Sequence, residues 1–258
     1  DRGVVHRSGC WTTAAPWSLH QRNLPGPRSR GAFIPDDREA NLPQPISAFL
    51  PRRAELRRRI RAELGLPDDA LVAITVGQLH RRKRLRDALW AADLLKVVRS
   101  DVHVLVVGEG PDREGLERFR RQVHIEDRVH FLGVRPDVPE LLLASDWFWS
   151  TSEREDVPWA LCEAQQLGIP VVATDIPAHR VFVAHGQSGL LFPLGDRAGP
   201  ARATFGLLED PSAVGPIIET ARTLYHHRED IARQSAENMG LRTRSVATLY
   251  AECRPVRR

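Results

Sequence analysis

Apolar runs and amphipathic segments alternate along residues 51–258, and this pattern predicts the fold. Leu71–Val76 and Val102–Val107 are continuous apolar runs of the length typical of strands that are buried on both faces. Between them, Leu85–Val98 repeats its apolar residues at the spacing of one helix face. Strands that alternate with helices in this way indicate βαβ units, so we expect an α/β fold built on a parallel sheet.

The other expected elements continue the alternation toward the C-terminus. Further helices are predicted at Ala54–Leu64, about Asp112–Val123, Pro139–Ser145 and Pro158–Leu167, and further strands at Val129–Phe131, Trp147–Trp149 and Val171–Ala173. After Leu190–Phe192 we expect several helices up to about Glu252. Residues 1–50 hold scattered Gly, Pro, Ser and Arg without a sustained period, which predicts irregular or disordered chain.

Charge, cysteine usage and hydropathy argue against several classes of protein. The net charge is only +4, because 33 acidic residues offset most of the 37 basic ones, so charge alone does not indicate a nucleic-acid binder. The 3 cysteines lie far apart and form no Cys-x-x-Cys pair, which argues against a zinc site or a disulfide framework. No apolar run approaches the roughly 20 residues that span a bilayer. We therefore expect a cytoplasmic protein.

Polar and glycine-containing segments follow the predicted strands. Gly77, Gly108–Gly110, Ser150–Glu155 and Thr174–Pro177 each come directly after an apolar strand. Because the carboxyl ends of parallel strands share one edge of the sheet, we expect these segments to lie together. Open α/β folds bind their ligands at that edge, so the pattern predicts a binding site there.

The residues at this edge favour a ligand that carries both hydroxyls and phosphates. Glu163 stands in an apolar helix, where a carboxylate is unfavourable unless a partner hydrogen-bonds it. Glu155 precedes that helix, and the two carboxylates can accept hydrogen bonds from a sugar and a ribose. Lys83, just beyond the first strand, supplies a cation, and a helix that begins near Pro158 offers N-terminal amides to a diphosphate.

The order and spacing of these segments resemble those of a known family. Glu155 and Glu163 enclose seven residues, as in the Glu-x7-Glu signature of retaining glycosyltransferases with the GT-B fold, notably family 4. Other segments match the donor-binding half of that family in order: Val76–Leu79 with Lys83, Val106–Pro111, Phe131–Gly133, Ala164–Asp175, Gly186–Gly189 and Gly195–Asp196. The resemblance covers roughly residues 50 to 250.

The resemblance implies a domain organisation for the chain. Residues 51–258 would be the Rossmann-like, C-terminal domain of a GT-B fold, which binds the nucleotide sugar and ends in helices. Residues 1–50 would be an irregular remnant of the N-terminal region and the crossing between domains. The chain starts at Asp1 rather than at a methionine, so we expect an incomplete product whose N-terminal domain is largely missing.

The resemblance also assigns roles to individual residues. Glu155 would contact the hydroxyls of the donor sugar as the catalytic residue, and Glu163 would accept from the ribose hydroxyls. Lys83 and the backbone of Val157, Pro158 and Trp159 would hold the diphosphate.

Three further positions come from the same comparison of motifs. Gln78 replaces the arginine usual in the family, so it can donate hydrogen bonds without a charge. Gly110 would approach the nucleotide, although a purely structural tight turn explains Gly108–Gly110 as well. The main chain at Val134 would meet the edge of the nucleobase.

The implied activity is transfer of a sugar, with retention, from a nucleotide-diphosphate-sugar donor to a hydroxyl on an unknown glycan, lipid or small-molecule acceptor. No metal or other cofactor is expected, since the histidines show no ligand spacing and relatives stabilise the diphosphate with helix dipoles and basic side chains. The alternative is a truncated or non-catalytic module that binds nucleotide sugars, with a separate N-terminal domain as a partner. A Rossmann-type oxidoreductase is disfavoured, because Arg113 occupies the place of the third fingerprint glycine.

Several residues have a plain structural interpretation. His80–Arg82 reads as a solvated basic turn, and Trp147 and Trp149 as packing residues on one strand face. The arginine-rich helix Arg52–Arg61 is expected to present a solvated face, with contact to anionic lipids as the alternative. Asp156 replaces a glycine common in the family and would oppose a diphosphate unless it points away.

Overall fold

The computed structural model describes residues 52–238, with side chains up to residue 227. Its larger unit, residues 34–228, holds the sheet; of the second unit, only the end of helix α8 at 229–238 is described. The helices are α1 Arg53–Glu63, α2 Leu85–Val98, α3 Arg113–Gln122, α4 Val138–Ala144, α5 Trp159–Gln166, α6 Pro177–Arg180, α7 Gly199–Glu209 and α8 Val214–Asn238. The strands are β1 Leu71–Val76, β2 Val102–Val107, β3 Val129–Gly133, β4 Trp147–Ser150, β5 Val171–Thr174 and β6 Leu190–Phe192. The predicted segment 1–50 and the helices expected beyond residue 238 lie outside the described residues.

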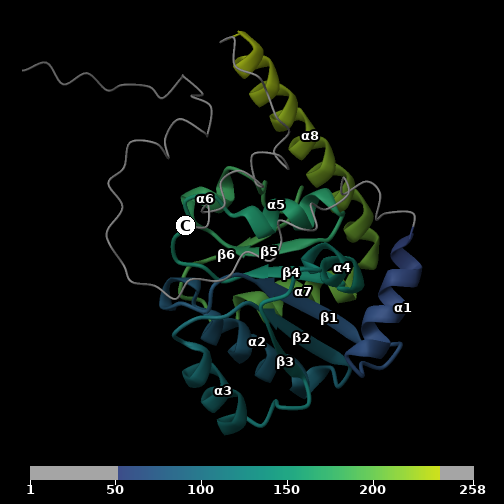
Figure 1. Cartoon of the computed structure of the whole chain (residues 1–258), viewed down its shortest axis with the longest axis vertical. Coiled ribbons are helices and arrows are strands. Elements are labelled where there is room, and N and C mark those ends of the chain that lie inside the picture. The colour runs from purple at the N-terminus through teal and green to yellow at the C-terminus, as the bar shows by residue number, and fades with distance from the viewer. Residues whose placement is uncertain (1–51, 239–258) are drawn as a thin grey trace, which may run out of the picture. The chain divides into compact units, whose positions relative to one another are not determined.

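The six strands form one parallel sheet in the order β3-β2-β1-β4-β5-β6 (Figure 1). Every pairing is parallel, with Ala73 of β1 opposite Val104 of β2 on one side and Trp147 of β4 on the other. The chain order therefore reverses between β1 and β4. This is the strand order of the dinucleotide-binding α/β fold, in which the crevice at the reversal point is the usual ligand site. The predicted α/β, Rossmann-like fold is confirmed.

Alternation along the strands sends side chains into two apolar layers. Ala73, Val104 and Trp149 face a layer that includes residues of α2, α3 and α7. Ile74 and Leu105 face the opposite layer, formed with α1, α4 and α5. Both faces are covered by helices, which is why the strands read as continuous apolar runs.

The interpretation of Trp147 and Trp149 as packing residues agrees with the structure. Their side chains are buried in the first layer, and Nε1 of Trp149 donates to Oγ1 of Thr204 at 2.9 Å. Of the two, Trp149 also reaches the edge of the sheet where the candidate site lies.

The predicted solvated face of α1 is confirmed at Arg58 and Arg59 but is wrong for Arg61. Arg61 is 2% exposed and donates to the carbonyls of Ala70 and Ala144 and to Asp146, while Arg57 donates to Ala144 and to the other oxygen of Asp146. These bonds attach α1 to the start of β4, a contact that the helical pattern alone does not reveal. Arg58 remains exposed, and so does Arg59, which pairs with Glu140.

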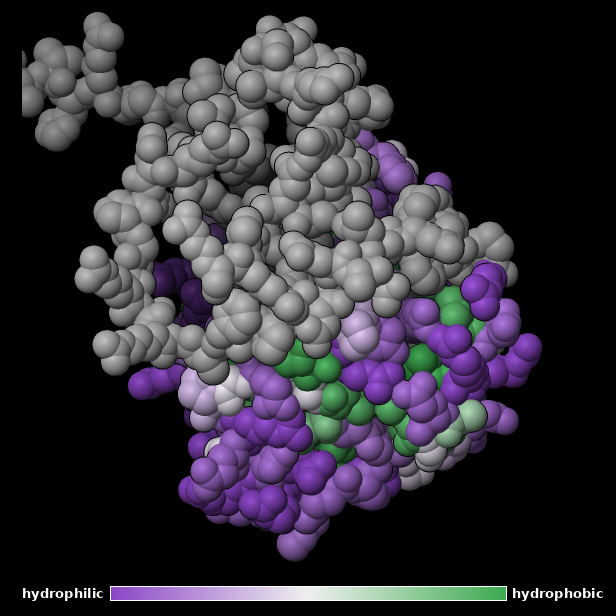
Figure 2. Space-filling view, in the orientation of Figure 1, coloured by the Kyte–Doolittle hydropathy of each residue, from purple (hydrophilic) through white to green (hydrophobic). Residues whose placement is uncertain are grey.

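The described surface is mainly hydrophilic on the side shown in Figure 2, with hydrophobic residues in separate areas among charged ones. The large hydrophobic residues that are exposed are Leu94, Val97, Val98, Val134, Val181 and Leu194. Among the described helices, none is both long and apolar enough to cross a membrane.

Candidate functional site

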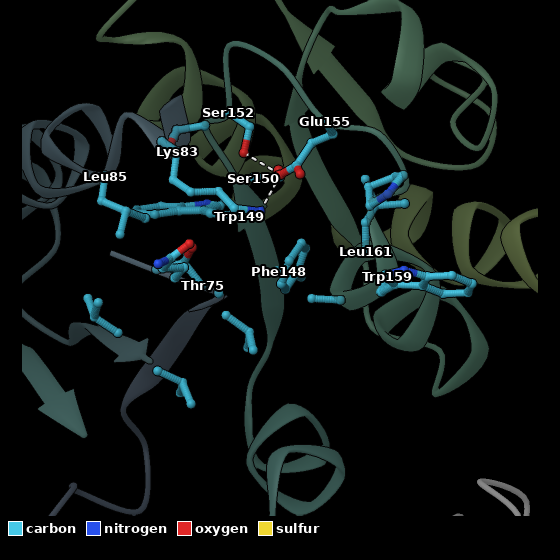
Figure 3. A pocket seen from close by; sticks show the side chains of 18 of the residues that line it. Thr75, Lys83, Leu85, Phe148, Trp149, Ser150, Ser152, Glu155, Trp159 and Leu161 are labelled. Atoms are coloured by element: carbon cyan, nitrogen blue, oxygen red, sulfur yellow. Dashed lines mark hydrogen bonds and ion pairs between the residues drawn. The ribbon is translucent and has the colours of Figure 1, made fainter. Parts of the chain in front are cut away.

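A cleft of about 410 Å³ opens at the carboxyl ends of β1 and β4, where the strand order reverses (Figure 3). This volume includes space that is open to solvent. The lining residues are Thr75–Leu79, Lys83, Leu85, Val106, Val107, Phe148–Ser152, Glu155 and Pro158–Leu161. Loops from both sides of the sheet's midline thus contribute, as expected for the crevice of an open α/β sheet.

Backbone bonds hold the loops after β1, β2 and β3 against one another. Gly77 N–H donates to Val107 O at 2.9 Å, and Leu79 N–H donates to Glu109 O at 2.9 Å. A Cβ on Gly110 would collide with the backbone of Leu79, just as one on Gly108 would collide with the carbonyl of Gly77. Both glycines are therefore required by packing between loops, which supports the tight-turn interpretation of this segment.

Lys83 and Glu155 form an ion pair within the lining of the cleft. Nζ of Lys83 lies 2.5 Å from Oε1 of Glu155, and the side chains are 19% and 9% exposed. Ser152 donates its hydroxyl to the same carboxylate oxygen at 2.6 Å, and Figure 3 shows both contacts as dashed lines. Within the cleft lining of the described part, Lys83 is the one cation and Glu155 the one carboxylate.

Two contacts attach the Lys83 loop to the Glu155 loop. The hydroxyl of Thr151 donates to Lys83 O at 2.8 Å, and Glu153 N–H donates to Arg82 O at 2.8 Å. The ion pair between Lys83 and Glu155 is therefore stabilised by hydrogen bonds between the two loops as well as by the attraction of its charges.

His179 supports the residues that lead into the Glu155 loop, a role that the sequence did not reveal, since His179 was noted only as one of the histidines without metal-ligand spacing. It is completely buried, with Nδ1 2.7 Å from Thr174 O and Nε2 3.1 Å from Oγ of Ser150. Since a carbonyl can only accept, the proton is on Nδ1 and Ser150 donates to Nε2. Burial lowers the pKa of His179, which favours this neutral form.

Thr174 completes this support. Its hydroxyl donates to Ser152 O at 2.5 Å, directly behind the residue that bonds Glu155. The sequence placed Thr174–Pro177 at the binding edge because this segment follows a strand. That position was the one feature of the sequence that pointed to a role for Thr174.

Helix α5 begins beside the cleft, one residue later than predicted. Pro158 occupies the N-cap position, since its φ of −83° and ψ of 69° lie outside the helical region, and the helix starts at Trp159. Pro158 and Trp159 both line the cleft. Glu163 lies one turn further along, half-buried and outside the lining.

The predicted site residues divide into two sets. Gln78, Lys83, Glu155, Pro158 and Trp159 line the cleft together. Gly110, Val134, Val157 and Glu163 do not, so nothing in the cleft geometry supports their predicted roles. Asp156 is exposed, as are His80, Arg81 and Arg82. Sequence reasoning did not single out Thr75, Leu85 or Ser152, which also line the cleft.

The described side chains also bear on metal binding. Within them, no group of three or more His, Cys, Asp and Glu residues is arranged to hold a metal ion. The expectation of a metal-independent site stays a prediction.

Comparison with known proteins identifies relatives of the chain. The model of the family described as glycosyl transferases group 1 matches residues 57–224. N-acetyl-alpha-D-glucosaminyl L-malate synthase of Bacillus anthracis is 31% identical over 182 residues, which are 69% of this chain and 48% of that protein. D-inositol 3-phosphate glycosyltransferase of Streptomyces avermitilis is 34% identical over 177 residues, covering 62% of this chain and 37% of the relative.

Solved structures show the same fold. HepE of Anabaena, crystallised with UDP and glucose, superposes with a TM-score of 0.66 at 25% identity over 72% of this chain and 52% of HepE. The C-terminal domain of LpcC from Francisella tularensis superposes with a TM-score of 0.58 at 18% identity, over 66% of this chain and 91% of that domain. The chain spans about half the length of the curated relatives it matches.

Proposed function

Because this chain belongs to the group 1 glycosyl transferases, we propose that it transfers a sugar from a nucleotide-diphosphate-sugar donor to a hydroxyl acceptor. The observation that carries the proposal is the cleft at the reversal point of the sheet, in which a cation and a carboxylate lie side by side. That position is the ligand site of open α/β sheets, and the two charges suit the two halves of a nucleotide sugar.

Lys83 is assigned to the diphosphate. A primary ammonium is a compact cation that binds phosphate as a point charge, and the adjacent start of α5 adds the positive end of a helix dipole. Both stabilise the negative charge that develops on the leaving diphosphate. Gln78 lines the same cleft and adds neutral hydrogen-bond donors in place of the usual arginine.

Glu155 is assigned to the sugar. Its carboxylate lies 2.5 Å from Lys83, so a donor whose diphosphate reaches Lys83 places its sugar next to Glu155. A double displacement uses a nucleophile and a separate acid–base group, and in the described part of the chain no second carboxylate lines the cleft. This favours retention by attack of the acceptor on the face from which the diphosphate leaves.

The relatives support this class of donor. HepE of Anabaena was crystallised with UDP and with UDP-glucose, which makes uridine nucleotides the first ligands to test. The roles of Glu163 at the ribose, of Val134 and Gly110 near the base, and of Val157 at the diphosphate stay predictions, as does the cytoplasmic location.

The test is release of nucleotide diphosphate from UDP-glucose and GDP-mannose in the presence of a panel of alcohol acceptors. We expect release with one donor, a rate at least about 100-fold lower in Lys83→Met, and little change in Glu153→Gln. Nuclear magnetic resonance of the product's anomeric proton distinguishes retention from inversion. Donor binding without release would favour the alternative function, a nucleotide-sugar-binding module. Absence of both binding and release would refute the proposal.

A further inference from the structure

Lys83 is the cation that a diphosphate would bind, and it is already paired with Glu155. The two groups are 2.5 Å apart, and Ser152 donates to the same oxygen of Glu155. In the described cleft lining no other cation is present that could bind phosphate. A ligand that binds Lys83 through phosphate must therefore compete with the carboxylate of Glu155.

The result of that competition depends on what replaces Lys83 beside Glu155. The Glu155 side chain is only 9% exposed, and a carboxylate at such a place is strongly unfavourable without a counter-ion or hydrogen-bond donors. A free nucleotide diphosphate takes Lys83 and adds further negative charge. It offers Glu155 no donor in exchange, because the sugar is missing.

A complete nucleotide sugar differs in this respect. Its diphosphate takes Lys83, while its sugar hydroxyls donate to Glu155 and take over the role of the lost ammonium. Ser152 donates to Glu155 independently of Lys83, so the carboxylate has one donor that the exchange does not require it to give up.

Resting on the proposed function, we infer that Glu155 makes the cleft discriminate between a nucleotide diphosphate that carries a sugar and one that does not. When the donor binds, Glu155 gives up its ion pair with Lys83 and accepts hydrogen bonds from the sugar hydroxyls instead. After transfer the sugar is gone, Glu155 pairs with Lys83 again, and the free nucleotide is released. Glu155 is thus a specificity-determining residue in addition to its proposed role at the sugar.

The neighbouring acids provide a matched control. Glu153 stands two residues earlier on the same loop, but its side chain is 46% exposed and its charge is 4.0 Å from Arg84. Replacing Glu153 by glutamine removes the same charge from the same loop and leaves the Lys83–Glu155 pair intact. It therefore measures the general electrostatic effect of one carboxylate near a diphosphate.

The experiment is calorimetric titration of the full chain with UDP and with UDP-glucose, in wild type, Glu155→Gln and Glu153→Gln. We expect Glu155→Gln to bind UDP at least about tenfold more tightly than wild type, which corresponds to the lower range for a charge-assisted bond. The same variant should bind UDP-glucose no more tightly than wild type. Glu153→Gln should change both affinities by less than about threefold, as exposed charges do. In a Lys83→Met background, Glu155→Gln should give no gain beyond that of Glu153→Gln.

A second readout needs no ligand. The chain has only two lysines, Lys83 and Lys96, so mass spectrometry after brief treatment with an amine-reactive reagent reports on each separately. Glu155→Gln should speed modification of Lys83 and leave Lys96, which pairs with Asp93, unchanged. A thermal melt checks that the variant is folded, and Glu155→Ala replaces it if it is not.

The outcomes separate the two proposals. Equal or weaker binding of UDP by Glu155→Gln, or an equal gain in Glu153→Gln, overturns the discrimination by Glu155 while wild-type binding of UDP-glucose upholds the donor site. If the wild type binds neither ligand, the proposed function itself fails.

Discussion

Acidification is predicted to destabilise the fold through His130, which lies half-buried on β3 at the edge of the sheet. Its ring stacks on that of His103 in β2 at 5.4 Å between centroids, with 3.2 Å between Nδ1 of His103 and Nε2 of His130. The pKa of His130 is lowered from 6.5 to about 4, first by burial and then by the nearby charges of His103 and Arg120, while Asp127 acts in the opposite direction.

The sign follows from the two pKa values. The unfolded chain protonates His130 near its ordinary pKa of 6.5, whereas the folded chain does so near a pKa of about 4. Between these values the unfolded state holds more protons, so the free energy of unfolding falls as the pH drops below 6.5 and is unaffected by this group at higher pH.

The magnitude follows from the same difference. It corresponds to at most about 3 kcal/mol below pH 4, and to about 2 kcal/mol near pH 5. Because solvent screens a half-buried edge position, we expect about 1 kcal/mol near pH 5.

Urea unfolding at about pH 7.5 and about pH 5 measures this effect in wild type and His130→Phe. Phenylalanine keeps the stacked ring but cannot bind a proton. Every other titrating group is present in both proteins, so the difference between their pH responses isolates the histidine pair. The variant should lose about 1 kcal/mol less than wild type on acidification. Equal losses in the two proteins would show that protonation of His130 does not destabilise the fold.

Substitutions at three further positions test the loops and the site. Gly110→Ala should cost about 3 kcal/mol of unfolding free energy in urea titrations, because the new Cβ meets the rigid backbone of Leu79; a cost under about 1 kcal/mol would contradict this packing. Arg84 has a φ of 49°, so the free energy of unfolding should be about 1 kcal/mol higher for Arg84→Gly than for Arg84→Ala. Both variants lose the ion pair with Asp87, but only glycine relieves the strain of the left-handed backbone. Equal free energies of unfolding would show that the backbone is not strained at this position. Glu163→Ala should weaken UDP binding about tenfold in calorimetry if Glu163 holds the ribose, and unchanged binding would remove it from the site.

The sequence predicted the elements well where apolar runs end sharply. The predicted bounds Leu71–Val76, Leu85–Val98 and Val102–Val107 coincide with those of β1, α2 and β2, because polar or glycine residues stop each apolar pattern. Strand β3 was predicted too short: it continues past Phe131 to Gly133, because its ladder with β2 persists to Gly133 through a register shift between Val106 and Val107.

The grouping of the site was also predictable, but its contacts were not. Parallel strands bring their carboxyl ends to one edge, so the sequence placed Lys83 and Glu155 in one region without any long-range information. That the two form an ion pair across 72 positions depends on side-chain conformations and on the Thr151 and Glu153 contacts between loops. The burial of Arg61 was missed for a similar reason, because its partner Asp146 lies 85 positions away in the sequence.

We propose that the cleft between β1 and β4 binds a nucleotide sugar through Lys83. Calorimetric titration of UDP-glucose and GDP-mannose into wild type, Lys83→Met and Lys96→Met tests it most directly, because the two variants remove the chain's two lysines one at a time. We expect wild type and Lys96→Met to bind one of these donors with equal affinity, and Lys83→Met to bind it at least about tenfold more weakly. Equal affinities for the two lysine variants, or no binding of either donor by wild type, would show that Lys83 does not hold a nucleotide sugar in this cleft.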